Sequence, residues 1–137
     1  PYIEHPDTPM MQLADTIPPA GERRDLTLRM IALARLMMPT VNIAATTALQ
    51  TLSEHGLRMG LLAGANVVMP NLTPLRYREN YNLYTGKIHV DDSLEELLED
   101  LADICRDIGR RMETGDPGDP LHYLERIKVA GNDPADH

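Results

Sequence analysis

The chain has 137 residues, of which 42% are hydrophobic and 25% charged, and these proportions are typical of one soluble globular domain. Thirteen Lys and Arg against twenty-one Asp and Glu give a net charge of -8, which argues against nucleic acid or an anionic membrane as a partner. No apolar run approaches the length of a membrane span and no signal peptide opens the sequence, so we expect a cytoplasmic protein.

Strand and helix signals alternate in the first part of the chain. Residues 1–3 are predicted to be the end of a strand, which enters a loop rich in proline. A helix is predicted over 26–38, with Asp25 as its N-cap and Pro39 as its stop, because apolar residues recur at helical spacing. The short apolar stretch 41–45 then predicts a strand covered on both faces.

The middle of the sequence repeats this alternation. A second helix is predicted over 53–63, with Ser53 as its cap and Gly64 as its stop. The apolar stretch 65–69 is predicted to be the next buried strand. A β-α repeat of this length is typical of a parallel sheet.

The last part of the sequence is mostly helical. Thr73 and Pro74 open a helix predicted to run to about residue 84, and a short strand is predicted over 87–90. Residues 93–96 form a capping box for a strong amphipathic helix over 94–112, whose many acids we interpret as a solvated face. A turn-rich break, a short helix over 121–129 and a polar tail follow.

Polar residues follow each predicted strand, where parallel β-α folds bind their ligands. His5 and Asp7 could form an acid/base pair, but the sequence around Asp7 is typical of a capped turn, which is the interpretation we favour. Thr46 and Thr47 follow the second strand, and at least one of these hydroxyls is expected to be structural. Asn71 follows the third strand and could hold a polar ligand or cap the backbone; the sequence leaves both open.

Other chemistry-bearing side chains give weaker signals. Tyr77, Tyr81 and Tyr84 share one helical face, which is typical of packing in a core or at its rim. Cys105 is the only cysteine, which excludes a disulfide framework, a cysteine zinc site and a self-contained iron–sulfur cluster in this chain. No P-loop, G-x-G-x-x-G turn, nucleophile elbow or H-E-x-x-H motif occurs. The residues therefore predict part of a parallel β-α domain with a site at its strand ends.

Several longer sequence motifs are more specific than composition. They are P-Y-I-E-H-P-D-T-P-M at 1–10, T-L-R-M-I-A-L-A-R at 27–35, A-T-T-A-L at 45–49 and G-A-N-V-V-M-P-N-L-T-P at 64–74. Together they resemble, over about residues 1–90, the C-terminal half of the HydE family, the radical S-adenosylmethionine maturases of [FeFe]-hydrogenase. Biotin synthase and methylornithine synthase are similar relatives and stand as alternatives within the same superfamily.

The resemblance implies a fold and a chemistry. The fold is α/β: the C-terminal part of a (β/α)8 TIM-type barrel with about three βα units over 1–90, followed over 91–137 by a helical extension of the biotin/thiamin-synthesis-associated type. The chemistry is reductive cleavage of S-adenosylmethionine by a [4Fe-4S] cluster, giving a radical that acts on a small-molecule substrate, an iron-bound cysteine precursor.

The family's cluster loop, C-x-x-x-C-x-x-C, does not occur in this sequence. We therefore expect the chain alone to be inactive and its partner to be the missing N-terminal half-barrel. Part of the family carries an accessory cluster, and His89 stands where its first cysteine would be, so none is expected here. A different class of function is a non-catalytic half-barrel that binds a small molecule or completes the barrel of another chain.

The resemblance also assigns site residues, none of them catalytic or metal-binding in this chain. Around S-adenosylmethionine it places Pro6, Met69, Pro70 and Asn71. Facing the cavity and its substrate it places Thr46, Thr47 and Tyr81.

Overall fold

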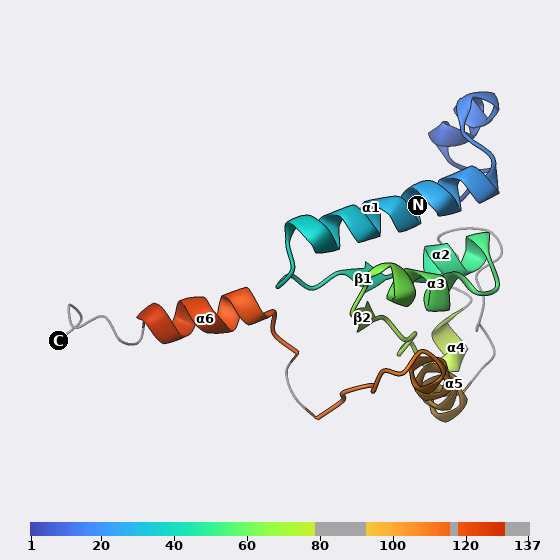
Figure 1. Cartoon of the computed structure of the whole chain (residues 1–137). Helices are drawn as coiled ribbons and strands as arrows, with labels where there is room; N and C mark the ends of the chain where they lie inside the picture. The colour runs from blue at the N-terminus through green and yellow to red at the C-terminus, as the bar shows by residue number, and fades with distance from the viewer. Residues whose placement is uncertain (79–92, 116–117, 131–137) are drawn as a thin grey trace.

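A computed structural model describes residues 1–78, 93–115 and 118–130. Helices surround a small parallel sheet, and one helix near the C-terminus extends away from the rest (Figure 1). The elements are η1 (Pro9–Thr16, a 3-10 helix), α1 (Ala20–Met37), β1 (Ala44–Ala45), α2 (Thr47–Leu52), α3 (Gly56–Ala63), β2 (Val67–Val68), α4 (Leu75–Arg78), α5 (Leu94–Asp107) and α6 (Leu121–Ala130). None of the helices in the described ranges is long and apolar enough to span a membrane.

The sheet consists of β1 and β2, which pair in parallel with Ala44 opposite Val67. This confirms the predicted parallel pairing of the stretches 41–45 and 65–69, although each strand is only two residues long. The strand predicted over 1–3 is wrong, because these residues are irregular. The Tyr2 carbonyl accepts a hydrogen bond from the α1 side chain of Arg23 instead.

Helix α1 begins earlier than the sequence predicted. Pro19 occupies the N-cap in an extended conformation, so the helix starts at Ala20 and Asp25 lies inside it rather than at its cap. Proline at the entrance needs no hydrogen-bond donor, which is why the proline-rich stretch leads directly into the helix. The predicted stop before Pro39 is confirmed, since α1 ends at Met37.

The helix predicted over 53–63 is two helices. Ser53 was predicted as an N-cap, but its backbone N–H bonds to the Leu49 and Gln50 carbonyls and closes α2 instead. The chain then turns, and Gly56 begins α3 directly against the α2 backbone. A Cβ atom at Gly56 would overlap the Leu49 carbonyl oxygen, so this corner requires glycine. The sequence analysis missed α2 because its six residues are too few for a periodic signal.

The structure confirms the predicted end of α3 but describes only the beginning of the next predicted helix. Gly64 ends α3 with a backbone φ of 123°, as its glycine predicted. The described part of α4 covers Leu75–Arg78, so the predicted helix to residue 84 and the strand over 87–90 lie outside the described residues. Tyr77 is 48% exposed, which places it at the rim rather than in the core.

The C-terminal helices agree better with the sequence. Ser93 and Glu96 form the predicted capping box of α5, with each side chain bonded to the other residue's backbone N–H. Helix α5 ends at Asp107 rather than near residue 112, because Gly109 adopts a φ of 70° and turns the chain. The short helix α6 is confirmed.

One hydrophobic core joins helices from both parts of the chain. Helix α1 packs against α2 and α3, and α5 contributes three side chains to the same core. The buried apolar residues are Ile31, Ala45, Leu49, Leu57, Leu61, Ala65, Leu97, Leu101 and Cys105. In Figure 1, α1 lies above and α5 below the layer that holds β1, β2 and α3. The core thus holds both strands by their flanking helices and leaves their ends accessible.

Candidate functional site

The carboxyl ends of β1 and β2 lie at the same edge of the sheet because the strands are parallel. A cavity of about 650 Å³ opens at this edge, between the strand ends and α5. Four of the residues predicted for the site line it: Thr47, Met69, Pro70 and Asn71. We call this cavity the strand-end cavity; its volume is that of a site for a cofactor or a small substrate.

Thr46 and Thr47 take different positions. Thr46 has an extended backbone and serves as the N-cap of α2, while Thr47 is the first residue of that helix. Ala45 faces α3, since a Cβ atom at Gly60 would lie 3.2 Å from its own. Thr47 lines the strand-end cavity, whereas Thr46 is not among its lining residues.

The segment after β2 is held by its own side chains. The Asn71 side-chain oxygen accepts a hydrogen bond from the Thr73 backbone N–H, so this residue closes a local turn ahead of α4 as well as lining the cavity. Met69 is 58% exposed and its thioether is available at the cavity wall. Both alternatives that the sequence left open for Asn71 are compatible with this position.

Arg78 is a residue that the sequence analysis missed. It is only 5% exposed, its Nε donates to the Thr73 carbonyl at 2.7 Å, and its Nη2 donates to the Asn71 carbonyl at 3.3 Å. Both carbonyls lie in the segment between β2 and α4, and no pattern in the sequence signals this contact. The guanidinium fixes the backbone that carries Asn71.

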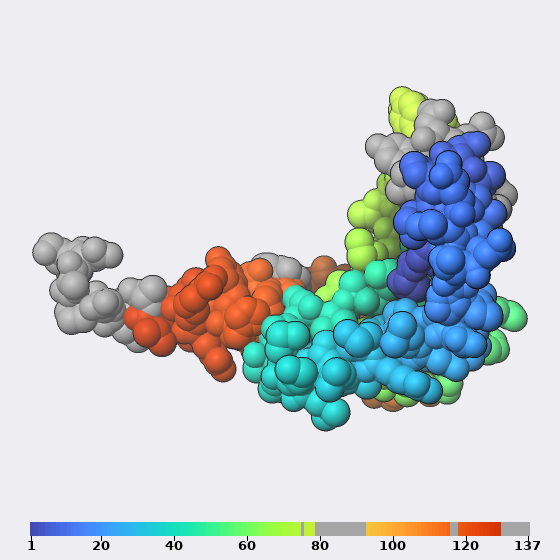
Figure 2. All heavy atoms as spheres, turned by 90° about the horizontal axis from the view of Figure 1, so that it is seen from above, coloured from blue at the N-terminus to red at the C-terminus, as the bar shows by residue number. Residues whose placement is uncertain are grey.

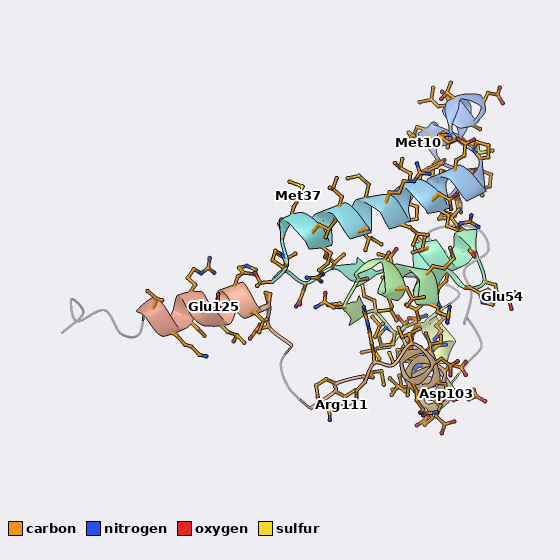
Figure 3. The ribbon with its side chains drawn as sticks, in the orientation of Figure 1. Met10, Met37, Glu54, Asp103, Arg111 and Glu125 are labelled. Atoms are coloured by element: carbon orange, nitrogen blue, oxygen red, sulfur yellow. The ribbon has the colours of Figure 1, made fainter. Side chains whose placement is uncertain are left out.

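Acidic side chains form the outer rim of the strand-end cavity. Glu54 at the α2–α3 corner and Asp103 on α5 extend on the same side of the molecule (Figure 3). Among the described residues that line the cavity there is no Lys, Arg or His. The lining carboxylates are Glu54, Asp100, Asp103 and Asp107. Arg106 pairs with Asp103 at 2.8 Å, but both side chains are well exposed, so solvent weakens the pair.

An apolar floor lies beneath this rim. It is built by Leu57, Val68, Leu97, Leu101 and Ile104. The acids of α5 are exposed, as their interpretation as a solvated face predicted, but that interpretation missed the cavity they border. The spacing of residues 100, 103 and 107 on one helical face was the available signal. A cavity with this floor and rim suits a ligand with an apolar body and positive charge.

The turn at His5 lies apart from this cavity. The Asp7 backbone N–H donates to His5 Nδ1 at 3.2 Å, and the Thr8 hydroxyl donates to the His5 carbonyl at 2.8 Å. These bonds show a local turn, in which the His5 ring and carbonyl rather than the Asp7 carboxylate are the acceptors. His5 Nδ1 and an Asp7 carboxylate oxygen lie 4.0 Å apart. Pro6 is exposed and does not line the strand-end cavity, and Tyr81 lies outside the described residues.

A charged pair ties the first residues to α1. Arg23 Nη2 lies 2.6 Å from a Glu4 carboxylate oxygen, and its guanidinium lies 5.7 Å from the centre of the Tyr2 ring. The hydrogen bond from Arg23 lowers the pKa of the Glu4 carboxyl below its ordinary value of 4.5. Arg23 Nε and the Tyr2 hydroxyl are buried without a hydrogen-bond partner among the described residues.

The amino ends of the strands border a second cavity, of about 940 Å³. Arg35 donates to the carbonyls of Gly64, Pro39 and Val41 and to the side chain of Asn66. Every nitrogen of its guanidinium is thus engaged in joining chain segments. We interpret this end as structural.

No cluster of three or more metal-ligating His, Cys, Asp or Glu occurs within residues 1–78, 93–115 and 118–130. Cys105 is buried on α5, and its neighbours at the second cavity are Arg110 and Arg111. This donor set does not resemble an iron–sulfur or zinc site.

Comparison with known proteins gives one similarity and one negative result. The chain is 47% identical over 93 residues to the [FeFe] hydrogenase maturase subunit HydE of Thermotoga maritima. The alignment covers 66% of this chain and 24% of that protein, in its C-terminal part. The predicted resemblance to the C-terminal half of HydE is confirmed, and the chain spans about a quarter of the length of the curated relative it matches. No family model matches the chain.

Proposed function

We propose that this chain is the C-terminal part of a HydE-type radical S-adenosylmethionine enzyme that acts in [FeFe]-hydrogenase maturation. The observation that carries the proposal is the 47% identity over 93 residues to a hydrogenase maturase subunit. The geometry supports it, since Thr47 and the Met69–Asn71 segment meet at the carboxyl ends of parallel strands, where barrel enzymes bind their substrates.

The fold proposed for the parent protein is a (β/α)8 barrel. Its last βα units would be residues 1–90, and residues 91–137 would form a helical extension. The parallel pair β1–β2 with α2 and α3 between its strands has the connectivity that such a barrel repeats. A two-stranded parallel sheet needs further strands to form a barrel, so the remaining units would come from elsewhere.

The strand-end cavity fits S-adenosylmethionine in its chemistry. Val68, Met69 and Pro70 offer an apolar wall for an aromatic base, and Asn71 offers a side-chain amide. The carboxylate rim favours a ligand with a sulfonium and an ammonium group. When bound, S-adenosylmethionine supplies a carbon radical for hydrogen abstraction. This chain's residues bind and orient it: Met69 and Pro70 by contact, Asn71 by its amide, and Arg78 by fixing the Asn71 backbone.

The proposed substrate side includes residues beyond the strand-end cavity. Thr46 is assigned to the substrate side by resemblance, and it does not line the strand-end cavity. The resemblance also assigns Tyr81 to the substrate side, and it assigns Pro6 to the mouth of the cavity. Thr47 stands between the two sides, at the first turn of α2.

A [4Fe-4S] cluster does not fit the residues of this chain. Three cysteines are needed to hold the radical cluster, whereas the sequence has Cys105 alone, buried on α5. The cluster ligands would therefore be supplied by another segment, and we assign no step to the cluster here.

A second candidate is a half-barrel that completes another chain without catalysing a reaction. The observation that favours it is the two-stranded sheet, whose outer edges have no strand partner within the described residues. Enzymes similar to biotin synthase or methylornithine synthase stand as alternatives within the radical superfamily.

A chimera tests the leading proposal. The stretch of this chain that is similar to the Thermotoga maritima maturase replaces its counterpart in that protein, and 5′-deoxyadenosine release and hydrogenase maturation are measured. We expect both activities to be retained. Asn71→Ala in the chimera is expected to lower 5′-deoxyadenosine release, because it removes an amide from the cavity wall.

Leu72→Ala is the matched control, since Leu72 is exposed and does not line the cavity. Circular dichroism and cluster absorbance establish that each chimera is folded and loaded. A folded, loaded chimera that releases 5′-deoxyadenosine without maturing hydrogenase would favour another enzyme of the superfamily. A folded, loaded chimera with no release would favour the non-catalytic half-barrel.

A further inference from the structure

Helix α6 stands apart from the core with most of its surface exposed. Figures 1 and 2 show it projecting beyond the body of the molecule. Leu121 is 60% and Ile127 46% exposed, and Leu124 is the one residue in 121–129 that is partly covered. An apolar helix face of this kind is unstable in water unless something covers it.

The apolar and charged residues of α6 are arranged as in helices that bind in an apolar groove. Tyr123, Leu124 and Ile127 lie on one face at helical spacing. Lys128 flanks this face on one side and Arg126 on the other, with the Arg126 guanidinium 5.5 Å from the centre of the Tyr123 ring. The helix thus offers apolar anchors between two cations.

The strand-end cavity has the complementary pattern. Its floor on the α5 side is Leu57, Leu97, Leu101 and Ile104, and its rim carries the four carboxylates named above. An apolar helix face would cover the floor, and its flanking cations would meet the acids. Charge and hydrophobicity therefore match between two exposed parts of the same sequence.

Helix α6 lies away from this cavity in its own copy. The Asn42 side chain donates to the Gly118 carbonyl at 2.8 Å, which ties the start of α6 to the amino ends of the strands. His122 Nδ1 lies 3.5 Å from the Thr40 carbonyl at the same end. The strand-end cavity is at the opposite, carboxyl ends, and no residue of α6 lines it.

We propose that α6 of one copy docks in the strand-end cavity of a second copy, on its α5 side. Tyr123 and Ile127 are the anchors, and Lys128 and Arg126 pair with carboxylates from the set Asp100, Asp103 and Asp107. The interaction is weak and reversible, because each copy carries a charge of -8 and exposed ion pairs contribute little. Docking needs only this chain, and it would compete with S-adenosylmethionine because both use the strand-end cavity.

Charge reversal and rescue test this docking by sedimentation equilibrium of the 137-residue chain. The wild type is expected to self-associate with increasing concentration. The variant Arg126→Glu/Lys128→Glu is expected to weaken association at least tenfold. Asp100→Lys/Asp103→Lys should weaken it similarly, and mixing the two variants should restore it, since opposite charges then meet again.

A matched control addresses the other exposed apolar face. Leu36 lies on α1 at 81% exposure, so Leu36→Lys should leave association unchanged if α6 is the docking element. Wild-type chain that stays monomeric, association that survives the α6 reversal, or loss of association in Leu36→Lys would each overturn the proposal. Reversed variants that fail to rescue each other would also overturn it, because the groove would then not be the partner of α6.

A zero-length carbodiimide cross-link gives a second readout. Lys128 is one of two lysines in the sequence, and the reagent joins an amine to a carboxylate in contact. A mixture of ¹⁴N and ¹⁵N chains should yield mixed-isotope peptides linking Lys128 to α5. Links found only within one isotope would contradict docking between copies.

Discussion

The two ends of the parallel strands differ in how their polar groups are used. At the amino ends, Arg35 and Asn66 form a closed set of hydrogen bonds, and Asn66 also joins the Ile43 backbone N–H and the Asn42 side chain. At the carboxyl ends, carboxylates and the exposed Met69 border an open cavity. One end is built to hold the strands, and the other leaves chemical groups accessible to a ligand.

Helix α1 shows the same difference in two of its four arginines. Arg35, near its C-terminus, bonds through all three guanidinium nitrogens. Arg23, near its N-terminus, pairs with Glu4 but leaves Nε unpartnered among the described residues. A guanidinium whose donors all have partners stabilises a fold more than one with a buried, unpartnered nitrogen. We therefore expect α1 to be held more firmly at the structural end.

Arg35→Met gives the largest expected loss of stability. The methionine keeps the apolar stem but removes the arginine donors to the Gly64 and Val41 carbonyls and one of the two donors to the Asn66 side-chain oxygen. We expect a loss of about 3 kcal/mol in the free energy of unfolding, measured by urea denaturation. Arg29→Met on the exposed face of α1 is the control, with a loss below about 0.5 kcal/mol. Equal losses of stability in the two variants would show that the hydrogen bonds of Arg35 do not hold the amino ends of the strands.

Gly64→Ala probes the same end through the backbone. A Cβ atom there would lie 2.9 Å from the Arg35 Cβ, in addition to the cost of a φ of 123°. We expect a loss of about 2 kcal/mol in thermal or urea unfolding. Gly109→Ala is the matched control, since it has a positive φ and open space around its Cβ, and should cost about 1 kcal/mol. A larger loss at Gly109 would show that contact with Arg35 is unimportant.

Met69→Ala tests the carboxyl end, where function rather than stability should respond. Because Met69 is mostly exposed, the free energy of unfolding should fall by less than about 0.5 kcal/mol. In the chimera with the Thermotoga maritima maturase, the same change should reduce 5′-deoxyadenosine release, since the cavity wall loses its thioether. Strong destabilisation with unchanged release would reverse our assignment of the two ends.

The Glu4–Arg23 pair gives the smallest expected effect, and it depends on pH. The folded pKa of Glu4 lies below its ordinary value of 4.5, so the pair stabilises the fold above that pH. This contribution is lost as the pH falls through the folded pKa, because the carboxyl then takes up a proton. Glu4→Gln should lower the melting temperature slightly at about pH 6, and the difference should shrink as the pH falls through the folded pKa. If the melting temperatures of the variant and the wild type still differ by the same amount in acid, the effect of Glu4 comes from packing rather than from its charge.

The sequence predicted the parts of the fold that rest on local chemistry. The Ser93 capping box, the Gly64 stop and the Pro39 boundary follow from one to four residues each. The parallel pairing of the two apolar stretches also followed from their pattern. The start of α1 and the split at Gly56 did not, because they depend on what the chain packs against rather than on periodicity.

The sequence predicted the residues that the strand ends contribute to the candidate site, but not those that α5 contributes. Thr47, Met69, Pro70 and Asn71 meet at one cavity, as residues after parallel strands must. The α5 acids and Arg78 were missed, since their position depends on how α5 and α4 pack in space. The structure brings four of the predicted residues together, but the roles of all of them stay predictions, as do those of Thr46, Pro6 and Tyr81.

The lone thiol of Cys105 has a consequence for measurement. It lies buried in the core on α5, and no second cysteine occurs in the sequence. Because the thiol is only 6% exposed, the rate at which a thiol reagent labels it reports local opening around α5 without any engineered probe. Because Cys105 is the only cysteine in the sequence, all labelling by the reagent can be assigned to this one position.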